Sequence, residues 1–140
     1  MFVATAPERR ATIAEVARAF RISENHLVKV VHFLGQEGFL ENSRGRGGGL
    51  RLARAPREIN VGAVVRASEG DIAPVPCFEQ GGERCALEGA CNLAGVLARA
   101  VSAFYRVLDA TTLADVVSNH ETLSAILHGP VPVRRRAVAA

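Results

Sequence analysis

The three cysteines of the chain, Cys77, Cys85 and Cys91, lie in one stretch rich in glycine and proline. An odd number of clustered thiols cannot all pair in disulfides, and in a cytosolic protein such a cluster serves metal binding or redox chemistry. The spacing C-x7-C followed by C-x5-C contains no C-x-x-C pair, which disfavours a zinc ribbon or a thioredoxin-type site. An iron–sulfur cluster is the favoured interpretation, while zinc, a thiol switch and inert cysteines stay open.

A basic, glycine-rich run, Arg44–Gly49, is the second group that could do chemistry. Apolar residues alternate on either side of the run, which predicts a β-hairpin with the run at its tip. The stretch from Asn42 to Arg57 has five arginines and no acid, as suits a wing that lies along DNA phosphates or enters a minor groove. No Gly-Lys-Ser/Thr follows, which disfavours a nucleotide-binding loop, whereas a solvated charged turn stays open. The residues expected to contact DNA here are Arg44, Arg46, Gly47 and Arg51.

Two short predicted helices precede the hairpin. Thr12 and Glu15 form a capping box at the start of the first helix, which reaches Phe20. Ser23 is the predicted N-cap of the second helix, whose apolar residues repeat at helical spacing until Gly38. Two helices joined by so short a turn indicate a helix-turn-helix.

The polar face of the second helix could reach base edges and phosphates. In a helix-turn-helix the start of the second helix enters the major groove, and Asn and Lys have the donors and acceptors needed there. An ordinary solvated helix face is the alternative. The expected DNA-contacting residues of this helix are Ser23, Asn25, His26, Lys29 and His32.

A long amphipathic helix is predicted to begin beside Cys91, where its N-terminal dipole would favour the metal-ligating thiolate. Its apolar stripe continues for about four turns. Next to a small DNA-binding domain, such a stripe predicts a homodimer interface, since a two-fold protein matches a palindromic operator. The predicted interface residues are Leu93, Val96, Leu97, Ala100, Val101, Phe104 and Leu108.

Charge and length bound the rest. Of 140 residues, residues 1–60 carry ten Arg and Lys against six acids, and residues 61–133 carry four against eight. We therefore expect the basic first half to face a polyanion and the acidic second half to have a different role. No apolar run reaches the roughly 18 residues of a membrane helix, and the first residues do not form a signal peptide, so we expect a cytoplasmic protein without a membrane partner.

The expected fold is mainly α with a small β-hairpin wing: a winged helix-turn-helix plus a long dimerisation helix. Asn60 is a predicted N-cap for the helix that connects the two parts, and Thr112 and Asp115 cap a short later helix. The predicted divisions are a DNA-binding domain (1–60), a connecting helix and linker (61–76), a cysteine loop (77–91), the dimerisation helix with C-terminal helices (92–128) and a disordered basic tail (129–140).

Taken together, these residues resemble a known family. The run from Thr12 to Arg57, the cysteine triplet before a long helix and the segment Thr112–Asp115 occur in the order seen in the NsrR branch of the iron–sulfur winged-helix repressors, which are related to IscR. The resemblance covers roughly Met1–Leu127. It implies a dimeric DNA-binding repressor with an iron–sulfur cluster, 2Fe-2S or 4Fe-4S, that senses nitric oxide or iron–sulfur status, and it makes Cys77, Cys85 and Cys91 the ligands.

Two departures from the family pattern matter for the cluster. The IscR branch has a His three residues after its last cysteine, where this chain has Ala94, so the NsrR branch is favoured. Residues 1–5 resemble only the end of the helix that opens the family domain, so we expect a missing or misassigned start. Some NsrR-like proteins take a non-cysteine ligand from that segment, which leaves the fourth ligand here unassigned.

Rival functions use the same residues differently. A thiol-redox or zinc-dependent winged-helix regulator would keep the cysteines but bind no chromophore, and a winged helix used for protein contacts would not bind DNA. An enzyme is not expected and no catalytic residue is predicted. The four histidines, His26, His32, His120 and His128, lack triad or metal-ligand spacing with acids, and the last two are expected at the surface.

Overall fold

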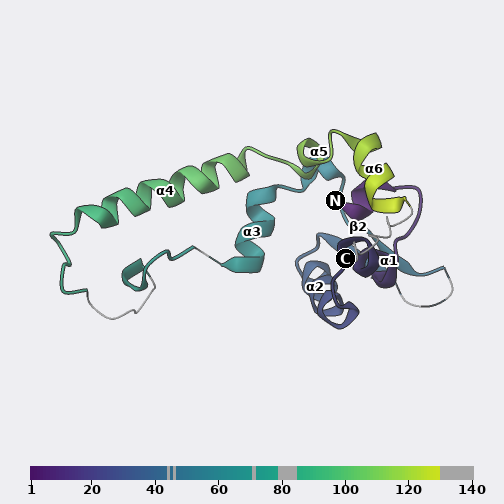
Figure 1. The fold of residues 1–140 in the computed structure, drawn as a ribbon, viewed down its shortest axis with the longest axis horizontal. Coiled ribbons are helices and arrows are strands. Elements are labelled where there is room, and N and C mark those ends of the chain that lie inside the picture. Colours follow the sequence, from purple (N-terminus) through teal and green to yellow (C-terminus); the bar gives the residue numbers. More distant parts are fainter. Residues whose placement is uncertain (44, 46, 71, 79–84, 130–140) are drawn as a thin grey trace, which may run out of the picture. The chain divides into compact units, whose positions relative to one another are not determined.

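The computed structural model describes residues 1–43, 45, 47–70, 72–78 and 85–129, and it divides into two compact units. The first unit comprises Met1–Arg54 and the segment from Val116, and the second comprises Ala55–Asp115 (Figure 1). The first unit holds η1 (Phe2–Thr5), α1 (Ile13–Phe20), α2 (Glu24–Gln36), β1 (Leu40–Ser43), β2 (Gly49–Leu52) and α6 (His120–His128). The second holds η2 (Pro56–Glu58), α3 (Val61–Glu69), η3 (Pro76–Phe78) and α4 (Asn92–Asp109), and α5 (Leu113–Val116) follows at its end. The mainly helical chain with one hairpin matches the predicted elements.

Helix α1 begins at the predicted capping box. The Glu15 N–H donates to Thr12 Oγ1 at 3.2 Å, and Glu15 Oε2 accepts from the Thr12 N–H at 2.7 Å. This second bond, which satisfies an N–H that the helix leaves unpaired, is the largest cause lowering the pKa of Glu15. Arg9 adds an ion pair to the same carboxylate at 2.8 Å.

Helix α2 ends where the chain needs a left-handed residue. Gly38 has φ +70°, its N–H donates to the Gly35 carbonyl at 3.1 Å, and the Phe39 N–H donates to the Leu34 carbonyl at 2.9 Å. These two bonds form a Schellman motif, which pairs carbonyls that have no partner inside the helix. The chain then turns directly into β1.

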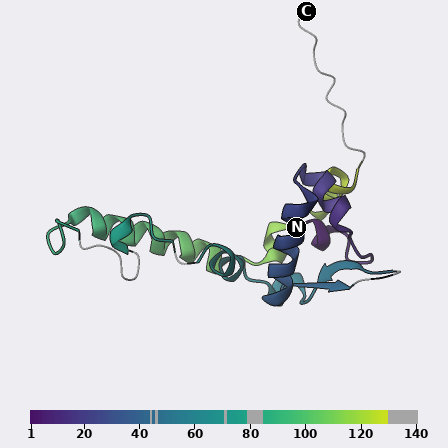
Figure 2. The same cartoon turned by 90° about the horizontal axis from the view of Figure 1, so that it is seen from below.

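The hairpin is anchored to the helices at its base. Strands β1 and β2 pair antiparallel, with Leu40 opposite Leu52 and Ser43 opposite Gly49. Ala11 pairs with the buried Leu50 through two backbone hydrogen bonds of 3.0 and 2.7 Å, so a third segment flanks β2. Gly49 has φ +139°, and a Cβ there would lie 2.8 Å from the Ala11 carbonyl oxygen, so the close approach requires glycine. Figure 2 shows the hairpin projecting from the helices of this unit.

The core of the first unit joins its helices, the base of the hairpin and the N-terminal turn. Buried residues from α1, α2 and β2 surround the side chain of Phe2, which is 5% exposed. The cluster consists of Phe2, Ala11, Val16, Ala17, Leu27, Val31 and Leu50, with Leu127 of α6 packed against it. The apolar stripes of α1 and α2 are thus the buried faces, as their spacing predicts.

Helix α6 lies against η1 (Figure 1), and His128 makes the contacts between them. The imidazole lies 4.3 Å from the ring centroid of Phe2, Nδ1 lies 3.1 Å from an Arg9 guanidinium nitrogen, and Nε2 lies 3.0 Å from Thr5 Oγ1. Because a guanidinium only donates, Nδ1 accepts, and the Nε2–H donates to Thr5, whose own hydroxyl donates to the Phe2 carbonyl at 3.0 Å. His128 is therefore a half-buried packing residue of the first unit rather than the surface residue that the sequence indicated.

The second unit depends on Asn60, the predicted N-cap of α3. Its Oδ1 accepts from the Ala63 N–H at 2.9 Å, while its Nδ2 donates to the carbonyls of Asp109 and Thr111 at 2.7 and 3.4 Å. One amide therefore satisfies a free donor at the start of α3 and a free acceptor at the end of α4.

Next to Asn60, the two segments through which the chain enters and leaves the second unit pair with each other. The Val61 N–H donates to the Thr111 carbonyl at 2.9 Å, and the Leu113 N–H donates to the Ile59 carbonyl at 2.8 Å. The paired segments form a short two-stranded neck at residues 59–61 and 111–113.

Helices α3 and α4 pack together through Tyr105, which is 8% exposed. Its hydroxyl donates to the Gly70 carbonyl at 3.0 Å and accepts from the Ile72 N–H at 3.2 Å. Arg66 of α3 lies over the Tyr105 ring, 4.1 Å from the centroid, and makes a two-point ion pair with Asp109 that lowers the pKa of that carboxyl. The end of α3 and the chain that follows it are thereby fixed to α4. No helix in the described part of the chain is long and apolar enough to cross a lipid bilayer.

Replacing Asn60 with Ala should lower the free energy of unfolding by about 2 kcal/mol, because it removes a helix cap and a further hydrogen bond. Urea unfolding followed by circular dichroism measures this change. Asn119→Ala is the matched control, since Asn119 is the N-cap residue of α6 but makes no side-chain cap hydrogen bond. The control should change stability by less than about 0.5 kcal/mol, and an equal loss in both variants would contradict the role given to Asn60.

The first unit should lose stability in mild acid. Partial burial and then the Arg9 guanidinium lower the pKa of His128 below its ordinary value, although Glu15 acts in the opposite direction, and His120 adds a smaller lowering. The unfolded chain therefore takes up a proton that the folded chain resists, so this contribution is complete above about pH 6.5 and is lost as the pH falls below it.

Thermal unfolding at about pH 7.5 and pH 5.5 tests this expectation across the range in which histidine titrates. The midpoint should fall more for the native chain than for His128→Gln, which cannot take up the proton. The same fall in both proteins would show that His128 does not cause it.

Candidate nucleic-acid interface and metal site

The polar face of α2 is exposed along its whole length. The apolar face of the same helix is buried, with Leu27 at 6% and Val31 at 3% exposure. The structure therefore separates the residues expected to contact DNA from those that hold the helix. All five of them, Ser23, Asn25, His26, Lys29 and His32, are exposed.

Ser23 has the extended backbone of an N-cap, but its side chain makes no cap hydrogen bond. The hydroxyl and the first N–H groups of α2 therefore face solvent, where a helix N-terminus favours an anion such as a phosphate.

Arg21 is a residue of this surface that the sequence analysis did not single out. It ends α1 in the left-handed conformation, with φ 55° and ψ 42°, and it is exposed. A non-glycine residue pays about 1 kcal/mol for that conformation. Arg21 is the C-cap residue of α1, and because it is exposed in the turn before α2, its guanidinium is a candidate phosphate contact. The feature of the sequence that could have indicated this role is the position of Arg21 in the short turn between the two predicted helices.

One arginine of the hairpin, Arg51, forms an ion pair within the chain. Arg51 of β2 lies opposite Glu41 of β1 and donates to its carboxylate through two nitrogens. Half of each side chain is exposed, so the pair contributes little stability but occupies the guanidinium. Gly47 is exposed with φ +80°, and in the described part of the chain no atom lies within 4 Å of a Cβ added there. Arg44 and Arg46 lie outside the described residues.

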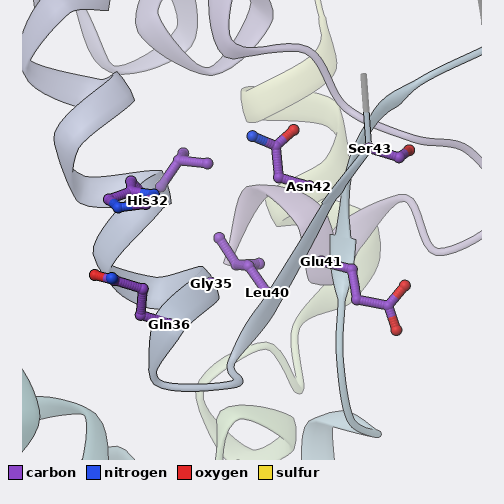
Figure 3. A pocket seen from close by; sticks show the side chains of 8 residues that line it. His32, Gly35, Gln36, Leu40, Glu41, Asn42 and Ser43 are labelled. Carbon is purple, nitrogen blue, oxygen red and sulfur yellow. The ribbon is translucent and has the colours of Figure 1, made fainter. Parts of the chain in front are cut away.

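A groove of about 530 Å³ runs between α2 and β1 (Figure 3). Its lining residues are Val31, His32, Gly35, Gln36, Leu40, Glu41, Asn42 and Ser43. In Figure 3 the side chains of Leu40 and Asn42 point from the strand toward the helix, whereas Glu41 and Ser43 point to the other face. The groove thus joins the exposed face of α2 to the hairpin.

The cysteines are free thiols. Cys77 lies in η3 and is exposed, Cys85 is exposed, and Cys91 is half-buried at the N-cap position of α4, where the sequence placed it. The donor set suits iron, since thiolates are the usual ligands of iron–sulfur clusters. Within the described ranges no three His, Cys, Asp or Glu side chains lie close enough to hold a metal ion, and residues 79–84 fall outside those ranges. Among the described residues, the structure therefore contains the three thiol donors but does not bring them together into a metal site.

Helix α4 divides the predicted dimer residues between two faces. Leu93, Val96 and Phe104 are 59%, 49% and 45% exposed, and Ala100 is exposed as well. Leu97, Val101 and Leu108 are partly buried on the side that also carries Tyr105. The structure adds Val107, 66% exposed, to the first face. Positions 93, 96, 100 and 107 follow the a/d spacing of a helix that pairs with another helix, whereas positions 97, 101, 105 and 108 fall on a different side.

Comparison with solved structures identifies the fold. The structure of CymR, the global cysteine regulator of B. subtilis, has a TM-score of 0.68 and 29% sequence identity, covering 84% of this chain and 85% of that one. The structure of IscR from T. potens has a TM-score of 0.66 and 26% identity, covering 86% and 79% of the two chains. The prediction of a winged helix-turn-helix with a long additional helix is confirmed.

Comparison with known sequences gives the same answer. The HTH-type transcriptional regulator NsrR of Geobacillus kaustophilus is 47% identical over 120 residues, which cover 86% of this chain and 82% of the relative. The resemblance to the NsrR branch is confirmed, and so is the expectation of a transcriptional regulator rather than an enzyme. The model of the Rrf2 family, described as iron-dependent transcriptional regulators, matches residues 1–119. The chain therefore belongs to the Rrf2 family of transcriptional regulators.

Proposed function

We propose that the chain is a cytoplasmic, homodimeric repressor that binds a palindromic operator and releases it in response to nitric oxide. The observation that carries the DNA-binding part is the exposed polar face of α2 beside an arginine-bearing hairpin in a chain of this family. Ser23, Asn25, His26, Lys29 and His32 enter the major groove, while Arg44, Arg46 and Gly47 contact the flanking backbone or minor groove. Arg51 joins them when its guanidinium leaves Glu41. Domain 1–60 is the part that binds DNA.

The dimer interface is built on α4. Its outer face carries large apolar side chains that are about half exposed in the single chain, Leu93, Val96, Phe104 and Val107. Such a row loses its contact with water when a second copy covers it. Two copies related by a two-fold axis place two α2 helices on successive major grooves, which matches a palindromic site.

Cys77, Cys85 and Cys91 hold an iron–sulfur cluster, of 2Fe-2S or 4Fe-4S type. Support comes from three free thiols in a chain of an iron-dependent family and from relatives named NsrR. When bound, the cluster supplies iron, which nitric oxide coordinates strongly. The chain contributes the three thiols, and Cys91 is placed at the N-cap position of α4.

The cysteine segment, from Ile72 to Cys91, is attached to α4 at both of its ends, so a change in its conformation could act on that helix. Tyr105 fixes one end of the segment at Ile72, and Cys91 fixes the other at the start of α4. The two anchors are separated by fourteen helical residues, about 21 Å along the axis. A change in the loop therefore acts on both ends of the helix that carries the dimer face. The neck at residues 59–61 and 111–113 connects this unit to the chain of the DNA-binding unit.

The metal proposal is tested on the full chain purified without oxygen. The native protein should be brown and contain iron and sulfide, its visible spectrum should change with nitric oxide, and its operator affinity should then fall at least about tenfold, a change of 1.4 kcal/mol. Each of Cys77→Ser, Cys85→Ser and Cys91→Ser should lose iron while keeping its helical circular dichroism.

Other outcomes separate the rival functions. A colourless native protein that contains zinc, or that forms a disulfide when oxidised, would replace the cluster with a zinc site or a thiol switch. Equal operator affinity with and without the cluster at the same salt concentration would contradict control by the cluster.

Neutralising Glu41 should tighten DNA binding. Glu41→Gln frees the Arg51 guanidinium and removes a negative charge, so affinity should rise, and the slope of log K against log salt should steepen by about one phosphate contact. Stability should change by less than about 1 kcal/mol, because the pair is exposed. Fluorescence anisotropy over a salt series measures both quantities.

Glu69→Gln in α3 removes the same charge from the second unit and serves as the control. An equal gain in both variants would mean that net charge alone, and not the release of Arg51, raises the affinity.

A further inference from the structure

One glycine of α2 has no explanation in the fold. Gly38 needs its left-handed conformation, and Gly49 needs the space at Ala11, but Gly35 has neither requirement. Its φ is not in the left-handed range, and a Cβ added there would meet its nearest atom, the Leu40 carbonyl oxygen, at an ordinary contact distance of 3.8 Å. Glycine within a helix destabilises the helix relative to alanine. The cost at Gly35 is therefore not required by packing among the residues that the structure describes.

Gly35 lies in the lining of the groove between α2 and β1 (Figure 3). Its missing side chain leaves the middle of the groove open, between Val31 and Leu40 on the apolar side and the polar groups of His32, Gln36 and Asn42. Asn42 points from β1 toward the helix. The lining thus combines apolar contact surface with neutral hydrogen-bond donors.

Glu41, the acidic residue of this lining, does not point toward the space in which an anion would lie. Glu41 points to the opposite face of β1, where its carboxylate accepts hydrogen bonds from Arg51. The side chains that face the helix from the strand, Leu40 and Asn42, are uncharged. A phosphate in the groove would meet donors and no free carboxylate of the lining.

We propose that this groove seats the sugar–phosphate strand that separates the major from the minor groove, with Gly35 giving the strand room and Asn42 and Gln36 donating to its phosphates. The inference rests on the proposed function. If α2 lies in the major groove and the hairpin reaches the neighbouring minor groove, the strand between those two grooves has to pass between α2 and β1. The groove lies in that place and has an apolar side for the sugars and polar side chains for the phosphates.

Gly35→Ala tests the groove without unfolding the protein. Alanine favours the helix and has room in the free protein, so the thermal midpoint should stay the same or rise. The added methyl group would push the DNA strand away from Asn42 and Gln36, so DNA affinity should fall about tenfold, which corresponds to the loss of one hydrogen bond to a charged group. Gly95→Ala is the matched control, since Gly95 lies in α4 and an added Cβ would meet its nearest atom, a nitrogen of Arg99, at 3.9 Å. Gly95→Ala should be at least as stable as the native chain and should bind DNA with the same affinity.

Asn42→Asp gives a second measurement, because it places a negative charge where the phosphate would lie. It should weaken binding about tenfold to an operator selected from random duplexes and to a mixed-sequence duplex alike, since phosphate contacts carry no sequence information. Asn119→Asp, at the exposed N-cap of α6, makes the same change elsewhere in the first unit and should have a small effect.

The outcomes separate the two proposals. If the native chain binds no DNA under any cluster state, the proposed function fails. If the native chain binds and Gly35→Ala and Asn42→Asp bind equally well, only the groove proposal is overturned. A loss confined to the selected operator would also overturn it, because the residues would then contact bases rather than the backbone.

Discussion

The second unit depends on the amide of Asn60. Most helix caps satisfy one end of one helix, but this side chain accepts from the start of α3 and donates to carbonyls at the end of α4 and beyond it. The same residue lies in the neck where the chain enters and leaves the unit. Because both ends of the Asn60 amide are occupied, a displacement of α4 relative to α3 breaks hydrogen bonds at once. The Asn60 amide therefore holds α3 and α4 together beside the neck.

The contacts between α3 and α4 extend this rigidity. Arg66 lies over the ring of Tyr105 and pairs with Asp109, and Gly62 is buried where a Cβ would overlap the Asp109 carboxylate. The small residue on α3 lets the helices approach, and the arginine fixes their register. The segment that carries the cysteines is therefore attached to α4 through Ile72 at one end and Cys91 at the other.

Much of this structure could be predicted because it is local. The capping boxes at Thr12 and Thr112 and the cap at Asn60 each involve residues three positions apart, so the sequence shows them directly. The two faces of α2 follow from helical periodicity, and the family resemblance gave the order of the parts.

Features that involve distant residues could not be predicted in this way. The contact between Thr5 and His128 joins residues 123 positions apart, and the pairing of Arg51 with Glu41 depends on the register of the hairpin. The stripe of α4 looks continuous in sequence, yet only the packing of α3 shows which half is covered. Gly35 resembles any glycine until the space around it is known.

The first unit is assembled from both ends of the chain, and this has a consequence for synthesis. Phe2 is buried partly by the His128 ring, so its burial is completed only after α6 has been synthesised. Closing so long a loop is slow and entropically costly compared with forming α1 and α2. A chain that ended before α6 would contain the entire helix-turn-helix but would lack the His128 ring that packs on Phe2, so it would be less stable and more open to proteases than the finished protein.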